Sequence, residues 1–66
     1  MIVTVNGTSR ELPQNVSIAA LLKDLGVSSE GTAVALNGAV VPRREHGKTT
    51  LCDGDVVEVI RAVAGG

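Results

Sequence analysis

The sequence of 66 residues contains no Phe, Tyr or Trp, and it has only one cysteine, Cys52, and one histidine, His46. A single cysteine cannot form a disulfide within the chain, and one Cys with one His offers too few ligands for a structural zinc site. The core must therefore consist of aliphatic side chains, which supply most of the 44% apolar content. This length allows one domain at most.

The sequence also lacks a basic excess and a long apolar run. The formal net charge is −1, so nothing neutralises a phosphate backbone, and no aromatic side chain can stack on bases. No run approaches the ~18 apolar residues of a membrane span. The opening "MIVTVNG" has no charged segment followed by an apolar one, as a signal peptide would. We therefore expect no nucleic-acid or membrane partner, and the unpaired cysteine favours a reducing cytoplasm.

Two segments with an Asn-Gly pair at their centre predict β-hairpins. Residues 1–5 and 8–12 flank the first pair, and residues 32–36 and 39–41 flank the second, with Pro42 ending the fourth strand. Asn-Gly is a strong hairpin signal because both residues tolerate positive φ. A last strand is predicted at 56–63, whereas "RREHGKTTL" has no clean period and predicts a loop, and "CDGD" predicts a turn.

One segment has the pattern of a helix. Its apolar positions are Ile18, Leu21, Leu22 and Leu25, which follow i, i+3, i+4, i+7 and form one stripe. Ser17 can accept a hydrogen bond from the free N–H groups of the first turn, and Val16 and Leu21 have the spacing of a hydrophobic staple. Gly26 stands where a left-handed C-terminal cap is needed.

These elements predict an α+β fold with two layers. The first and last strands are the most continuously apolar, which is typical of central strands, so we place them side by side. The helix then covers the face that carries Met1, Val3 and Val5. The arrangement is a β-grasp: a mixed sheet of four to five strands with one main helix packed on one face.

The opposite face of the predicted sheet has no second helix to cover it. The alternation of the strands places Ile2, Val56 and Ile60 there, with Glu58 among them. An uncovered apolar cluster on a small protein often marks a partner surface, although scattered exposed aliphatics are also normal. We predict that Ile2, Val56, Glu58 and Ile60 form a partner surface.

The polar residues of the predicted loops have structural interpretations. The carboxylates of Asp53 and Asp55 disfavour a thiolate at Cys52, so we interpret Cys52 as structural. "DGD" lacks the further oxygen ligands of a calcium loop and is interpreted as a turn. His46 lacks the nearby combination of a carboxylate and a nucleophile that a catalytic histidine uses, and it is interpreted as a solvated loop residue. No metal site is predicted.

A small basic cluster, Arg43, Arg44 and Lys48, follows Pro42. Such a cluster is usually a solvated face, but it can also meet acidic residues of a partner. The sequence leaves both interpretations open.

The sequence ends in "RAVAGG". Glycine-rich ends commonly fray, but a Gly-Gly end can also thread a narrow channel, since glycine has no Cβ. The terminal carboxylate of Gly66 is then ionised, unhindered and able to attack an activated phosphate, with Gly65 and Ala64 giving access to it. We predict a domain over 1–61 and a flexible tail over 62–66. These are properties of a carboxylate that another enzyme activates, so we expect no catalytic residues in this chain.

Five segments together resemble the ThiS family of sulfur carriers, in the ThiS/MoaD group of ubiquitin-like β-grasp proteins. They are "MIVTVNG", "VSIAALLKDLG", "AVALNGAVVPR", "LCDGDVVEVI" and the final "AGG". Each is weak alone, but in this order they cover nearly the whole chain. The absence of aromatics and Ala64 in place of a third glycine depart from the family pattern.

The resemblance implies a mechanism and partners. A ThiF-type enzyme adenylates the C-terminal carboxylate with ATP, the acyl-adenylate becomes a thiocarboxylate at Gly66, and the sulfur passes to a ThiG-type thiazole synthase in thiamine biosynthesis. No stably bound cofactor is implied. The alternatives are a sulfur carrier for another pathway, such as the small subunit of molybdopterin synthase, and a β-grasp interaction domain without covalent chemistry. The short "VSSEGT" after the helix favours the thiamine pathway.

Overall fold

The computed structural model describes residues 1–28 and 30–61, whose five strands form one mixed sheet in the order β2-β1-β5-β3-β4. The last strand lies in the middle of the sheet, parallel to β1 and antiparallel to β3. The elements are β1 (Ile2–Val5), β2 (Thr8–Glu11), α1 (Ile18–Asp24), β3 (Thr32–Leu36), β4 (Ala39–Val41), the 3-10 helix η1 (Arg43–Glu45) and β5 (Val56–Arg61). The prediction that the first and last strands are neighbours is confirmed.

Both predicted hairpin turns are confirmed. Asn6 and Gly7 have φ values of 50° and 82°, and Asn37 and Gly38 have 51° and 87°. Positive φ at both central residues is the type I′ geometry, whose twist matches that of the flanking strands. The two turns therefore set the register of β1 with β2 and of β3 with β4.

The helix begins and ends at the predicted caps. The Ser17 hydroxyl accepts a hydrogen bond from the Ala20 N–H at 3.1 Å. At the other end, Gly26 has a φ of 74°, its N–H donates to the Lys23 carbonyl, and the Val27 N–H donates to the Leu22 carbonyl. These two bonds form a Schellman motif, which requires a left-handed residue and so favours glycine at this position.

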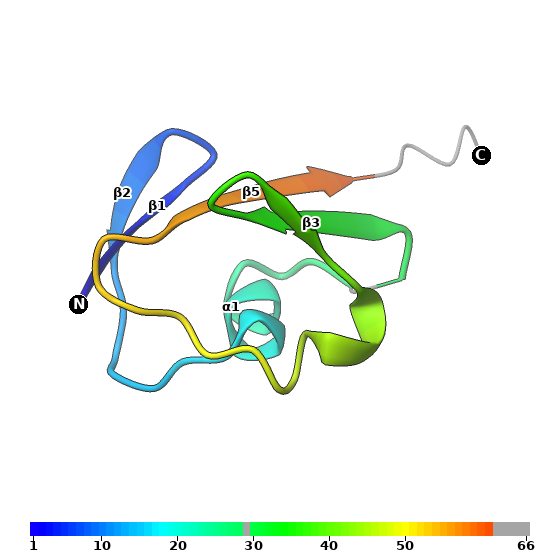
Figure 1. The fold of residues 1–66 in the computed structure, drawn as a ribbon, viewed down its shortest axis with the longest axis horizontal. Helices are drawn as coiled ribbons and strands as arrows, with labels where there is room; N and C mark the ends of the chain where they lie inside the picture. The colour runs from blue at the N-terminus through cyan, green and yellow to red at the C-terminus, as the bar shows by residue number, and fades with distance from the viewer. Residues whose placement is uncertain (29, 62–66) are drawn as a thin grey trace.

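The core lies between α1 and one face of the sheet (Figure 1). Its buried members come from the helix, from alternate strand positions and from the two loops beside the helix, and they are Val3, Val5, Leu12, Ile18, Leu21, Leu22, Val34, Leu51 and Val57. Burying one such side chain contributes about 1.5–3 kcal/mol. The opposite face of the sheet has no helix over it among the described residues (Figure 1).

The long segment between β4 and β5 packs against the start of α1. The Ile18 N–H donates to the Thr49 carbonyl at 3.0 Å, and the Leu51 N–H donates to the Val16 carbonyl at 2.8 Å. The first bond satisfies one of the N–H groups that a helix start leaves free, and the second ties the loop to the residue just before the cap. The segment predicted as a loop is therefore an ordered flank of the helix, with η1 at its beginning.

The structure contradicts the interpretation of His46 as a solvated loop residue. Its side chain is 2% exposed, and its Nε2 lies 3.1 Å from the Val41 carbonyl oxygen. A carbonyl oxygen only accepts, so Nε2 carries the proton. The backbone carbonyl of His46 also accepts the Ala19 N–H. Backbone bonds between this segment and the start of α1 place the imidazole ring in the interior. These bonds cannot be predicted from the residues next to His46.

The interpretation of "CDGD" as a turn is confirmed. The Asp53 carboxylate accepts the Ile2 N–H at 2.7 Å, and the Asp55 carboxylate accepts the Cys52 N–H at 2.7 Å. Gly54 has a φ of 87°. Both carboxylates thus serve backbone N–H groups at the point where the chain enters β5.

Candidate functional site

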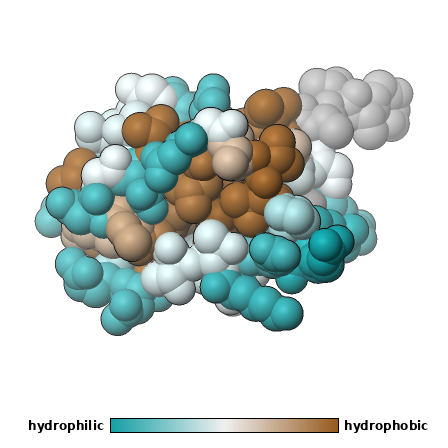
Figure 2. Space-filling view, viewed as in Figure 1, coloured by the Kyte–Doolittle hydropathy of each residue, from teal (hydrophilic) through white to brown (hydrophobic). Residues whose placement is uncertain are grey.

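The face of the sheet opposite α1 carries the exposed large apolar side chains of the described residues, and we call it the outer face. The exposed fractions are 48% for Ile2, 47% for Val56, 59% for Ile60 and 74% for Val40. In Figure 2, which has the same view as Figure 1, apolar surface gathers near the strands labelled β3 and β5 in Figure 1. The structure places the sequence-predicted Ile2, Val56, Glu58 and Ile60 on this one face.

Val40 is a member of the outer face that sequence reasoning missed. Ala35 pairs with Val40 on one side and with Glu58 on the other. Directly opposed residues of neighbouring strands point to the same face, so Val40 lies on the same side as Glu58. The signal was present in the second hairpin, since a two-residue Asn-Gly turn sets this register.

The two turn asparagines hold β5 from both sides. Asn6 Oδ1 accepts the Val59 N–H at 2.8 Å, and Asn6 Nδ2 donates to the Val59 carbonyl at 3.4 Å. Asn37 Oδ1 accepts the Val56 N–H at 2.9 Å, and the Asn37 N–H donates to the Val56 carbonyl at 2.7 Å. Sequence reasoning assigned both asparagines only a turn role. Their side chains also form hydrogen bonds with backbone groups of β5 that would otherwise have no partner in the sheet.

Asn6 extends the sheet beyond the end of β1. The backbone pairing of β1 with β5 covers only Thr4 with Val56 and Val5 with Val57, followed by the Asn6 N–H to the Val57 carbonyl. The Asn6 side chain then replaces one further peptide group beside β5. This side chain stabilises the half of β5 that leads toward the C-terminus.

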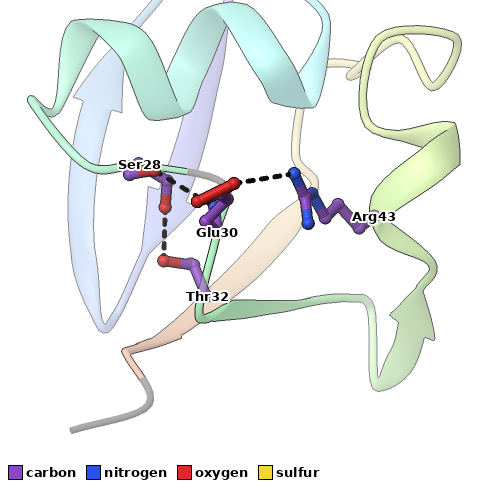
Figure 3. Close-up of polar contacts among 4 residues, drawn as sticks. All are labelled: Ser28, Glu30, Thr32 and Arg43. Atoms are coloured by element: carbon purple, nitrogen blue, oxygen red, sulfur yellow. Dashed lines mark hydrogen bonds and ion pairs between the residues drawn. The ribbon is translucent and has the colours of Figure 1, made fainter. Parts of the chain in front are cut away.

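The end of β5 lies beside the loop that precedes β3. Thr32, the first residue of β3, pairs with Arg61. The Thr32 hydroxyl donates to the Ser28 carbonyl, and Arg43 of η1 reaches Glu30 at 3.4 Å (Figure 3). The predicted tail residues Ala64, Gly65 and Gly66 lie outside the described residues, as does the whole of 62–66.

The basic cluster is divided between a pocket and the surface. An open pocket of about 550 Å³ is lined by Ala19, Arg43, Arg44, His46 and Gly47. Lys48 is exposed and is not part of this lining. Because Arg43 already has an acidic neighbour in Glu30, the cluster is not a concentrated positive site.

The described residues include one free thiol. Cys52 is exposed and makes no disulfide. Among the residues described, no group of three or more His, Cys, Asp or Glu side chains is placed to hold a metal ion. Within the same residues, no helix has the length and apolar character that a membrane crossing requires.

Comparison with known families shows which family the chain belongs to. The family model described as "ThiS family" matches residues 3–66. The chain belongs to the ThiS family. The ThiS match extends from Val3 in β1 to Gly66, and so includes the outer face except for Ile2, as well as the predicted tail.

The relatives fall into two groups by length. The sulfur carrier protein ThiS of Thermus thermophilus is 38% identical over 97% of this chain and 98% of its own length. A thiazole synthase of Paramagnetospirillum magneticum is 33% identical over all of this chain, which spans only 20% of that protein. The chain thus spans about a fifth of the thiazole synthases that it matches.

A solved structure supports the same assignment. The crystal structure of the thiamine biosynthesis protein ThiS from Geobacter metallireducens superposes with a TM-score of 0.86, at 36% identity, and covers the whole of both chains. The predicted fold class, a ubiquitin-like β-grasp with a mixed sheet and one helix, is confirmed.

Proposed function

We propose that this chain is a sulfur carrier protein that supplies sulfur for thiazole formation in thiamine biosynthesis. The observation that carries the proposal is the ThiS family match, which runs through the Gly-Gly end to Gly66. The relative from Thermus thermophilus that matches over nearly its full length is named as a sulfur carrier protein. The proposed role is that of a carrier and co-substrate, not of an enzyme, in the cytoplasm.

The proposed chemistry takes place at the carboxylate of Gly66. A carboxylate oxygen attacks the α-phosphorus of ATP bound by a ThiF-type adenylating enzyme, and pyrophosphate leaves. A hydrosulfide ion then attacks the carbonyl carbon of the acyl-adenylate, AMP leaves, and loss of the S–H proton gives a thiocarboxylate. Gly65 and Ala64 present no large side chain that would hinder entry into the partner's active site.

The sulfur acceptor in this proposal is a ThiG-type thiazole synthase. The support is that two proteins named thiazole synthase contain a segment matching this entire chain. The outer face is the proposed docking surface for the partner enzymes, since it exposes apolar side chains that no other described element covers.

Intact-mass measurement tests the proposed function. The purified chain is incubated with ATP, its adenylating enzyme and a sulfur source, and its mass is compared before and after. We expect an increase equal to the difference between sulfur and oxygen, located at Gly66 by fragmentation. The mass of the untreated chain establishes whether Gly66 is its last residue.

Deletion of Gly66 is the matched control. The core residues all lie between Val3 and Val57, so the truncated chain should keep its unfolding midpoint while losing the mass change. A full-length chain that gains no sulfur with any adenylating enzyme of its own organism would instead favour an interaction domain without covalent chemistry.

A further inference from the structure

Glu58 is a charged residue of the central strand β5 on the outer face, where the other charged residue that the described register places, Glu11, lies on the edge strand β2. Glu58 stands between Val56 and Ile60 on the same side of β5, since alternate residues of a strand share a face. Across the sheet it is paired with Ala35, beyond which lies Val40. Glu58 therefore has apolar neighbours along its own strand and across to the edge strand β4.

Glu58 has no cation beside it among the described side chains. Among the described side chains, ion pairs join Arg10 with Asp24 and Arg43 with Glu30, and neither pair includes Glu58. The residues that the register places on the outer face with Glu58 carry no basic group, and they are Ile2, Thr4, Ser9, Glu11, Ala33, Ala35, Val40, Val56 and Ile60. The carboxylate is exposed and is solvated in the free protein.

Docking an apolar surface on the outer face would remove water from this carboxylate. An ionised carboxylate that loses water without gaining a cation is strongly unfavourable. A cation placed opposite offsets that cost and rejects surfaces that lack one, so a buried interfacial pair contributes mainly specificity. The position of Glu58 is thus unfavourable for a purely apolar partner and selective for one of matching charge.

We propose that Glu58 is a specificity-determining residue for docking to a thiazole synthase whose contact surface carries an Arg or Lys side chain among apolar residues. The inference rests on the proposed function. Thiazole synthase is the chosen occupant because proteins of that name contain a segment matching all of this chain within their own sequence. An arginine fits best, since its planar fork can make two parallel bonds to one carboxylate.

Three substitutions at one position test the proposal. The full chain and its Glu58→Gln, Glu58→Leu and Glu58→Lys variants are titrated against the thiazole synthase of the same organism by calorimetry. We expect binding about tenfold weaker for Gln and Leu and about 100-fold or more weaker for Lys.

Leucine is the decisive variant. On a face that meets only apolar groups, Glu58→Leu would bind more tightly than the native chain, because it removes a desolvation cost. Equal or tighter binding by Glu58→Leu overturns the proposal. Weaker binding supports it, since a leucine leaves the partner's cation buried without its carboxylate.

Asp24→Lys is the matched control for charge. Asp24 lies in α1, on the other side of the sheet, and is exposed, and the substitution changes the net charge as much as Glu58→Lys does. We expect it to bind as the native chain does. An equal loss in both lysine variants would make the effect one of net charge and would overturn the proposal.

Rescue from the partner's side completes the test. The exposed Arg and Lys residues of the thiazole synthase are changed to Glu one at a time, and each is titrated against Glu58→Lys. One of them should restore at least a tenfold gain in affinity, and failure of every one overturns the proposal. All chain variants are first compared by amide NMR spectra, which should differ only around the substituted residue.

The test is separate from that of the proposed function. The mass change at Gly66 is measured with ATP, the adenylating enzyme and a sulfur source but without thiazole synthase, so its absence in the native chain would refute the carrier role whatever the calorimetry shows. If the Glu58 variants accept sulfur normally and bind the thiazole synthase as the native chain does, only the role of Glu58 is refuted. If they lose adenylation but keep thiazole synthase binding, the choice of occupant is wrong.

Discussion

The two faces of the sheet are built from the same kind of residue but differ in what covers them. Val57 and Val56 are consecutive residues of β5, yet Val57 is fully buried and Val56 is 47% exposed. On the inner face the valines belong to one core with α1 and Leu51, whereas on the outer face Val56 and Ile60 are exposed on either side of Glu58 along β5. The comparison teaches that side-chain type alone does not tell a buried face from an exposed one.

Aliphatic side chains on the two faces contribute to different free energies. Inner aliphatics contribute to folding in every molecule, at about 25 cal/mol per Å² removed from water. Outer aliphatics contribute little until a partner covers them, and then they contribute to binding. Substitutions on the two faces should therefore separate cleanly into effects on stability and effects on affinity.

The largest expected effect is on the free energy of unfolding, for a substitution in the core beneath the inner face. Leu21 of α1 is fully buried, so Leu21→Ala should lower the free energy of unfolding by about 2–5 kcal/mol. A small single core rarely supplies more than about 3–5 kcal/mol, so much of the variant should be unfolded at 25 °C. Urea titration followed by circular dichroism measures this, with the exposed Val40→Ala as control. A loss below about 1 kcal/mol would contradict the assigned core.

A pair of neighbouring substitutions gives the sharpest contrast between the faces. Val57→Thr buries a hydroxyl in the core and should cost about 1–3 kcal/mol of unfolding free energy. Val56→Thr makes the same chemical change in an exposed position and should cost less than about 0.5 kcal/mol. Equal losses in urea titration would show that the outer face is also covered in the free protein.

The outer face should respond in affinity instead. The double substitution Val56→Thr with Ile60→Thr keeps β-branched side chains in β5 but makes the face more polar. We expect about tenfold weaker binding to the partner enzymes, equivalent to about 1.4 kcal/mol, with the unfolding midpoint nearly unchanged. Unchanged affinity for both the adenylating enzyme and the thiazole synthase would exclude this face as their docking surface.

The smallest expected effect concerns the side-chain hydrogen bonds that hold β5, the central strand of the sheet. Asn6→Gly keeps the positive φ of the turn but removes the side-chain bonds to Val59, at a cost of about 0.5–1.5 kcal/mol. Hydrogen exchange should accelerate at the Val59 amide, whereas Asn37→Gly should accelerate it at Val56. Each variant is the control for the other, and unchanged exchange at Val59 in the first would mean that Asn6 does not hold β5.

Local signals predicted the elements well. The Asn-Gly pairs, the Ser17 cap and Gly26 marked the hairpin turns and both helix ends, because each depends on the backbone conformation of a few consecutive residues. The alternation of β5 also predicted correctly that Val56, Glu58 and Ile60 share a face.

Long-range contacts account for what the sequence did not show. His46 is buried because residues 46–51 bond to the start of α1, about 30 positions earlier in the chain. Val40 is different, because the Asn37-Gly38 turn sets its pairing with Ala35 locally and its place on the outer face could have been predicted. The bonds from the two turn asparagines to β5 join residues 53 and 19 positions apart, beyond any local pattern.

By itself, the sequence determined which residues of a strand share a face, where the chain turns and where the helix begins and ends. Only the tertiary structure decided which face is covered, that His46 lies inside, and that Glu58 is surrounded by apolar groups with no described cation beside it. The physical reason is that periodicity and turn geometry depend on backbone dihedral angles of adjacent residues. Burial instead depends on which distant segments pack together, and here one short helix can cover only one side of the sheet.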